Sequence, residues 1–191
     1  MLKELIRPAI LPPLDAAFQP AALCNRSFRS FAARDGVPFV IGLERKGNEL
    51  SRYETRVFPE GNPHFAQNYA YIERLVKFLL WQHGGYRIYL GGSKALGEYI
   101  RDLYSHNGER AFDSIFMGNQ VYEAGFEVCV CTPEEVPAEK ESGKMLGGHW
   151  EGCRVGFDLG ASDYKLAAVI EGKPVFHDET IWEPRKHADP E

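Results

Sequence analysis

The order of apolar and polar residues between positions 37 and 132 predicts a mixed α/β domain. Two runs of β-forming residues, 40–43 and 53–58, flank the turn-forming Lys46-Gly47-Asn48 segment, which is typical of a β-hairpin. After a break rich in proline and glycine, apolar residues recur every three or four positions and predict a helix that ends at residues 83–85. The residues with this spacing are Tyr69, Ile72, Leu75, Val76, Leu79 and Leu80.

A second strand and a second helix follow. The run YRIYL (86–90) predicts a strand stopped by Gly91 and Gly92, and Ser93 is a suitable N-cap for the next helix. The apolar face of that helix consists of Leu96, Tyr99, Ile100, Leu103 and Tyr104. The segment 112–125 fits no single period, and the run FEVCVC (126–131) predicts a further strand.

The first 36 residues lack a clear period and predict an irregular arm. Their prolines are Pro8, Pro12, Pro13 and Pro20. Three arginines alternate with Phe28 and Phe31 in the run CNRSFRSFAAR, so a nucleic-acid strand could stack there. We favour a loop anchored by the two phenylalanines, because large aromatic side chains are usually buried.

The period changes again near the C-terminus. Residues 133–152 are polar and bounded by prolines, so we place a domain boundary in this connector. Three strands are then predicted at 154–159, 165–170 and 174–182, with a turn at Glu171-Gly172. The last residues, 183–191, are polar without a capping element, as expected at a cut rather than a natural end.

The bend between the first two of these strands has the composition of a phosphate loop. Gly160, Ala161 and Ser162 are small, so their backbone N–H groups can approach an anion, and Ser162 adds a hydroxyl donor. Asp158, at the strand end, suits a hydrated Mg²⁺ that mediates between the carboxylate and phosphate. Lys165 could add positive charge or point to solvent. An ordinary hairpin whose Asp158 caps the turn is the alternative.

The run Asp158-Leu159-Gly160-Ala161-Ser162 resembles the first phosphate-binding hairpin of the actin-like ATPase superfamily. It is most similar to that of the ROK group (repressors, open reading frames and kinases), whose sugar kinases open with Asp-x-Gly-Gly-Thr. Here alanine replaces the second glycine and serine the threonine, and the resemblance covers residues 153–184. It implies that 153–191 begin a ribonuclease H-like ATPase lobe that binds ATP and Mg²⁺ through Asp158, Gly160, Ala161, Ser162 and Lys165.

The rest of that family pattern is absent. Too few residues follow Asp158 to hold the second phosphate loop, the aspartate base and the adenosine loop that the resemblance implies. The ROK zinc cluster is absent too; Cys129, Cys131, His149 and Cys153 could ligate a metal, but their spacing is not that of a structural zinc site, and we favour core thiols.

Two further features remain open. Gly91-Gly92 lies between a predicted strand and a helix N-terminus, a geometry that accepts anions and resembles the ROK adenosine loop; tight packing of the glycines is the favoured alternative. If Gly91-Gly92 is such an adenosine loop, residues 38–104, with the order ββαβα, are a degenerate copy of an actin-like half. For a general base, Asp113 and Asp163 are no better than other loop carboxylates. The histidines are scattered: His64, His83, His106, His149, His177 and His187.

Composition excludes some classes of function. The chain has 191 residues, of which 44% are hydrophobic, enough for a folded core. A net charge of −5 argues against a general nucleic-acid binder. No apolar run approaches the roughly 20 residues that span a bilayer, and the first residues do not form a secretory signal. Four cysteines without a disulfide pattern indicate a reduced, cytoplasmic protein.

Three functions follow from these observations. The favoured one is the N-terminal part of a ROK-type sugar kinase, inactive as this fragment, with ATP, Mg²⁺ and a sugar bound by the full-length protein. The others are a ROK-type sugar sensor without catalysis and a stand-alone binding or scaffold domain. The absence of a helix-turn-helix pattern argues against a DNA-binding sensor. A homodimer remains open.

Overall fold

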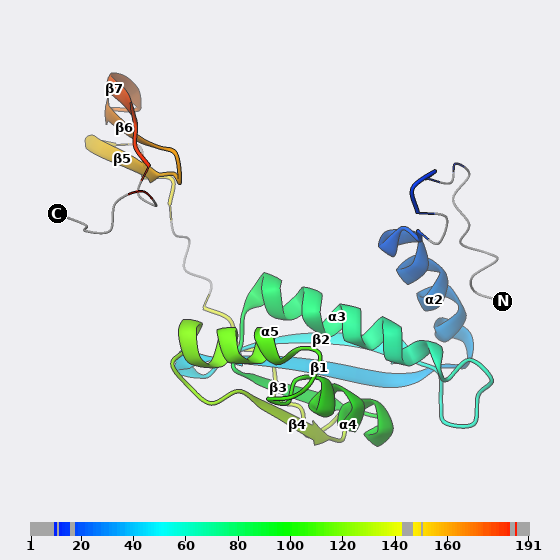
Figure 1. Ribbon diagram of the computed structural model, residues 1–191. Coiled ribbons are helices and arrows are strands. Elements are labelled where there is room, and N and C mark those ends of the chain that lie inside the picture. The colour runs from blue at the N-terminus through cyan, green and yellow to red at the C-terminus, as the bar shows by residue number, and fades with distance from the viewer. Residues whose placement is uncertain are drawn as a thin grey trace. The chain divides into compact units, whose positions relative to one another are not determined.

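The computed structural model describes residues 10, 12–15, 18–142, 147–149, 151–183 and 186. The chain forms two compact units, unit 1 (Met1–Ser142) and unit 2 (Gly143–Glu191), and the division between them falls inside the segment 133–152. Each unit has its own sheet, as Figure 1 shows, and the fold class is α+β as predicted. The first nine residues of the predicted arm, and the polar C-terminal segment after residue 183 except Lys186, lie outside the described residues.

Unit 1 is built on a four-stranded sheet with the order β2-β1-β3-β4. The predicted hairpin is confirmed, because β1 (Val37–Arg45) pairs antiparallel with β2 (Glu49–Val57) across a turn at Lys46–Asn48. Strand β3 (Arg87–Gly91) is antiparallel to β1, and β4 (Glu127–Cys131) is parallel to β3. Glycine suits position 47 because φ there is +81°.

Two helices supply the main core of unit 1 against this sheet. They are α3 (Gln67–His83) and α4 (Lys94–Leu103), both at predicted positions. Their apolar stripes meet one face of the sheet, because the odd-numbered residues of β1 alternate onto that face. The largest fully buried apolar side chains are Phe39, Ile41, Leu43, Val57, Ile72, Val76, Leu80, Ile88, Leu90, Leu96 and Ile100. The ambiguous segment forms α5 (Ala111–Ile115) and a π-helix, η2 (Phe116–Val121).

The prediction of an irregular segment is wrong for residues 21–35, which form helix α2 (Ala21–Asp35). Its buried side chains are Cys24, Phe28 and Ala32, spaced by four residues on one face. Phe28 stacks on Tyr71 of α3 with 4.0 Å between ring centroids. The prolines did not prevent this helix because they all precede it, and Pro20 is its N-cap. The arginines stay exposed.

The first part of the predicted connector belongs to unit 1. Val136 is buried against Gly42 and Gly91, and the backbone of Lys140 pairs with Leu50 at the edge of β2. The Arg52 guanidinium donates to the Val136 carbonyl at 2.7 Å. The segment 132–142 therefore closes over unit 1 and is not a free linker.

Unit 2 is a three-stranded antiparallel sheet with the order β5-β6-β7. Its strands, β5 (Cys153–Leu159), β6 (Asp163–Ile170) and β7 (Lys173–Ile181), confirm the three predicted ones. Glu171 and Gly172 have φ values of +49° and +73°, as a two-residue hairpin turn with the strand twist requires. None of the described residues of unit 2 is buried.

The close approach at Gly91 gives a test of unit 1. A Cβ at this position would lie 2.6 Å from the Val136 Cγ2 atom and 2.8 Å from the Thr132 carbonyl oxygen. We expect Gly91→Ala to lower the free energy of unfolding by about 1–3 kcal/mol, because the segment 132–136 must move away. Urea unfolding followed by far-UV circular dichroism measures this change. Gly125→Ala is the control, since a Cβ there meets no atom within 4 Å; equal losses in both variants would contradict the packing argument.

Candidate functional site

The bend between β5 and β6 is closed by its own backbone. The Gly160 N–H donates to the Asp163 carbonyl at 2.9 Å, and a Cβ on residue 160 would lie 2.8 Å from that same oxygen. Glycine is therefore needed here for the approach of Asp163. The sequence predicts a phosphate in this space, but the backbone of Asp163 already fills part of it.

Trp182 occupies the other side of the bend. Its backbone N–H donates to the Ser162 carbonyl and its indole Nε1 donates to the Gly160 carbonyl, each at 2.9 Å. The indole also meets the Tyr164 ring edge-on, with 5.9 Å between centroids. Two bend carbonyls are thus satisfied internally. Among the described residues, the N–H groups of Ala161 and Ser162 have no acceptor, so they are available to an anion.

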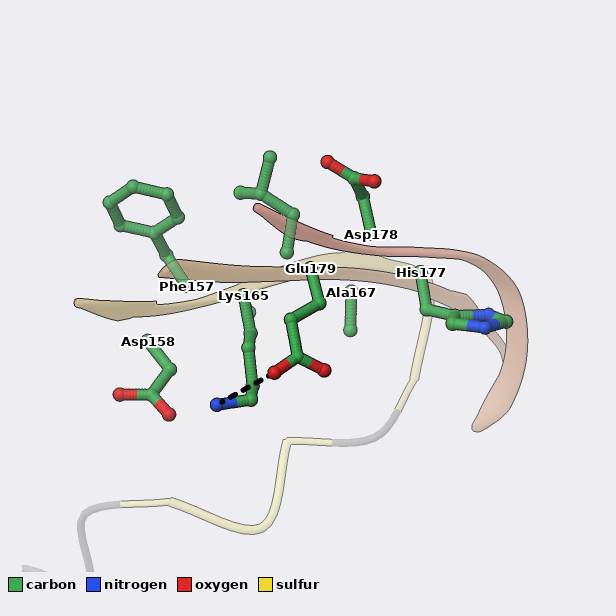
Figure 2. A pocket seen from close by; sticks show the side chains of 9 residues that line it. Phe157, Asp158, Lys165, Ala167, His177, Asp178 and Glu179 are labelled. Atoms are coloured by element: carbon green, nitrogen blue, oxygen red, sulfur yellow. Dashed lines mark ion pairs between the residues drawn. The ribbon is translucent and has the colours of Figure 1, made fainter. Parts of the chain in front are cut away.

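A row of charged side chains crosses the polar face of the same sheet. Asp158 pairs in register with Lys165, and Lys165 pairs with Glu179 on the third strand. Figure 2 shows these three side chains, with that of His177, on one side of the sheet, and Phe157 and Asp178 on the other. A hollow of about 410 Å³ is lined by these residues together with Gly156, Leu166 and Ala167.

Lys165 does not provide a free positive charge. Its Nζ lies 2.7 Å from Asp163 Oδ1 and 3.6 Å from Glu179 Oε1. The hydrogen bond from Lys165 lowers the pKa of the Asp163 carboxyl, and the same bond raises the pKa of the Lys165 ammonium. The Asp158 carboxylate, by contrast, makes no hydrogen bond or ion pair with any described residue. Two carboxylates pair with the one ammonium and a third, that of Asp158, lies in register beside it, so the local charge is negative.

This charge balance decides what the site can hold. A phosphate would be repelled unless a divalent cation came with it. Ser162 Oγ lies 3.4 Å from an Asp163 carboxylate oxygen, so it is weakly engaged and can turn toward a ligand. Among the described residues, no three side chains of His, Cys, Asp or Glu gather to hold a metal. Asp158 alone could contact Mg²⁺, whose other ligands would be water and phosphate oxygens.

The Gly91-Gly92 turn of unit 1 serves packing. The Gly92 N–H donates to the Cys131 carbonyl at 3.1 Å, and a Cβ on Gly92 would lie 2.7 Å from the Phe39 ring. Ser93 occupies the N-cap position of α4 as predicted, but its side chain makes no capping hydrogen bond. Its Oγ donates instead to the Glu60 carboxylate at 3.2 Å. A carboxylate next to the helix N-terminus disfavours a second anion there.

The proposed metal ligands are divided between the units. Cys129 and Cys131 lie on β4 in unit 1, whereas His149 and Cys153 belong to unit 2. The two β4 residues are free, partly buried thiols. Burial raises the pKa of Cys129 to about 11 and also raises the pKa of Cys131, so both are protonated near neutral pH.

The two carboxylates considered as general bases are both engaged. Asp113 is only 2% exposed, accepts a hydrogen bond from Trp81 Nε1 at 2.9 Å and lies 3.4 Å from Lys77 Nζ. Asp163 is paired with Lys165. Neither is free to take a proton from a substrate hydroxyl.

The sequence patterns did not predict that Asp163 and Trp182 bind the backbone of the bend, or that Asp163 and Glu179 pair with Lys165. The i,i+2 spacing of Asp163 and Lys165 on one strand was a usable signal, because such residues share a face. Glu179 and Trp182 depend on the register of β7, which no local pattern specifies.

Comparison of the chain with protein-family models, with curated proteins and with solved structures gives no match. In the part of the chain that the structure describes, none of the helices has the length and apolar character needed to cross a bilayer.

The Asp163–Lys165 pair can be tested by titration. Lys165→Met removes the ammonium that lowers the pKa of Asp163, so we expect this pKa to rise toward its ordinary value of 3.8. Because the folded-state pKa is lowered, the pair stabilises unit 2 above the ordinary pKa, and that contribution is lost as pH falls through the lowered value. NMR titration of the Asp163 carboxyl carbon measures this pKa in the unmodified protein and in Lys165→Met. Lys173→Met is the control, and an unchanged Asp163 pKa in Lys165→Met would argue against the pair.

Proposed function

We propose that unit 2 is the first phosphate-binding hairpin of a ROK-type sugar kinase-like protein. In this proposal the full-length protein transfers phosphate from ATP to a sugar, and the 191-residue chain contributes the opening strands of its ATPase lobe. The observation that carries the proposal is the bend itself. It combines two backbone N–H groups, at Ala161 and Ser162, with the carboxylate of Asp158 on the preceding strand, and none of these groups has a hydrogen-bond or ion-pair partner among the described residues.

The charges of the bend give each residue a role. The N–H groups of Ala161 and Ser162 would donate hydrogen bonds to a phosphate oxygen, and Gly160 keeps the bend tight by its contact with Asp163. Asp158 would orient water bound to Mg²⁺. The cation would neutralise the negative phosphate next to the carboxylates, because Lys165 is already committed to Asp163 and Glu179. Phosphate binding at this bend should therefore require Mg²⁺.

A second observation supports the proposed function: one face of the unit 2 sheet is not covered by the described residues. Val155, Phe157, Leu159, Leu166 and Phe176 share one side by strand alternation and register, and we call them the apolar face of unit 2. Phe157 is 58% exposed and Val155 76% exposed. A three-stranded sheet needs a packed hydrophobic face for independent stability. The proposed lobe would supply that layer, and its phosphate loop would be fixed in place by it.

Binding of Mg-ATP can be detected on the chain directly. We expect Mg-ATP to shift the backbone amide signals of Ala161 and Ser162 in NMR spectra, and ATP with a chelator to leave them unchanged. Asp158→Asn should remove the Mg²⁺-dependent shifts, because the carboxylate that orients the hydrated ion is lost.

Asp178→Asn is the matched control for that experiment. Asp178 is also an exposed aspartate, but its side chain lies on the opposite face of the sheet, as Figure 2 shows. Shifts that persist in Asp158→Asn, or that vanish equally in Asp178→Asn, would remove the basis for the proposed site.

Turnover is a separate matter. We expect the 191-residue chain to release ADP from Mg-ATP and a panel of sugars at the background rate only, because both candidate bases, Asp113 and Asp163, are engaged. A coupled assay for ADP measures this rate. Release clearly above background, abolished by Asp158→Asn, would show that catalysis needs no further lobe.

A further inference from the structure

Unit 1 carries a largely exposed group of aromatic and aliphatic side chains that the proposed function does not use, and of which Phe116 also packs against the core. We call it the aromatic patch; its members are Phe78, Trp81, Phe112, Ile115 and Phe116. Phe78 is 62% exposed, Trp81 45%, Phe112 69% and Ile115 37%. They come from α3, α5 and η2, which lie next to each other in Figure 1.

The rings of the aromatic patch are held in a fixed arrangement. The plane of Trp81 lies within 10° of that of Phe112 and 11° of that of Phe116, with centroids 6.5 and 5.5 Å apart. The Trp81 indole N–H is bound to the buried carboxylate of Asp113, which also pairs with Lys77. Ordered side chains lose little conformational entropy when they are covered.

These contacts also indicate the kind of ligand. The polar group of Trp81 and the neighbouring Asp113 are used inside the protein, so the aromatic patch offers an apolar surface with no free hydrogen-bonding group at its centre. A small polar ligand would find few partners there. Aromatic side chains with arginine nearby are typical of the centre of a protein–protein interface.

The area of the aromatic patch fits a symmetric contact of ordinary size. Taking roughly 200 Å² for each fully exposed large side chain, the four exposed members present about 400 Å² of apolar surface. One side of a standard interface buries about 800 Å², of which slightly more than half is apolar. The patch thus supplies about the apolar share of one side, and the polar rim must supply the rest.

The sequence of α3 suggests which partner supplies the other side. Arg74, Phe78 and Trp81 follow one another on the exposed side of α3 at spacings of four and three residues. If two copies of α3 cross antiparallel about a twofold axis at Phe78, Arg74 of each copy falls opposite Trp81 and Gln82 of the other. A guanidinium over an indole face is a favourable cation–π pair. In this arrangement each aromatic patch faces an apolar surface of equal area and an arginine that can pair with its indole.

We propose that the aromatic patch is the interface of a homodimer, in which two copies of the chain pack α3 against α3 around a twofold axis near Phe78. This inference rests on unit 1 alone and does not depend on the proposed function of unit 2. A twofold axis places the same surface on both partners, so one substitution changes the contact twice.

Sedimentation of the full chain tests the dimer. We expect a concentration-dependent dimer for the unmodified protein, and a dissociation constant at least about tenfold higher for Phe78→Glu, because the axis then brings two like charges together. Phe157→Glu is the control, since Phe157 is similarly exposed, at 58%, but belongs to unit 2. A monomer at all concentrations, or a dissociation constant that rises no more in Phe78→Glu than in Phe157→Glu, would overturn the proposal.

A second measurement tests the position of the axis. In a Cys153→Ser background, which removes the exposed native thiol, Phe78→Cys should form a disulfide between copies under mild oxidation. Ala70→Cys should not, because Ala70 is exposed on the same helix but lies roughly 12 Å along it, which separates the two copies of this residue by roughly 24 Å. Equal cross-linking of both variants would exclude the antiparallel contact, and a dimer that cross-links through neither would place the axis elsewhere.

Discussion

The three strands of unit 2 are held together by backbone hydrogen bonds, while their side chains contribute little burial. Every residue of β5 is exposed, and no layer formed by the described residues of unit 2 packs on the apolar face of Val155, Phe157, Leu159, Leu166 and Phe176. Such a sheet depends on whatever covers that face. The proposed phosphate site depends on the same cover, because the bend lies between two of these strands and can be no more rigid than they are.

Within the bend, neutralisation of Lys165 changes the chemistry more than any other contact. A lysine next to a turn of small residues is expected to attract phosphate, but here its ammonium pairs with Asp163 and Glu179. The remaining negative charge favours a cation before an anion. This is why the proposed role of Asp158 is tied to Mg²⁺, and why the resemblance to a phosphate hairpin and the electrostatics of the bend lead to the same ligand pair.

Unit 1 is stabilised differently, by close packing on both sides of its sheet. The helices cover one side with large apolar side chains, and Gly42 and Gly91 let Val136 approach the other. The Gly91-Gly92 turn therefore has a structural role although its sequence resembles a nucleotide loop. Apart from Phe116, the aromatic patch lies outside this core, as a surface used in association would.

Local periodicity determined most of the secondary structure. The helices α3 and α4 and the three strands of unit 2 lie within about two residues of their predicted positions, whereas β1 begins three residues and β2 four residues before the predicted start. Helix α2 was missed because prolines dominate the segment before it, whereas its burial depends on Phe28 meeting Tyr71, which lies 43 positions later in the sequence. The sequence also predicted a bend of small residues after Asp158, and such a bend lies between β5 and β6. Only the tertiary structure could show that Trp182 binds the bend carbonyls and that Lys165 is paired across strands, because strand register brings together residues that no local pattern connects.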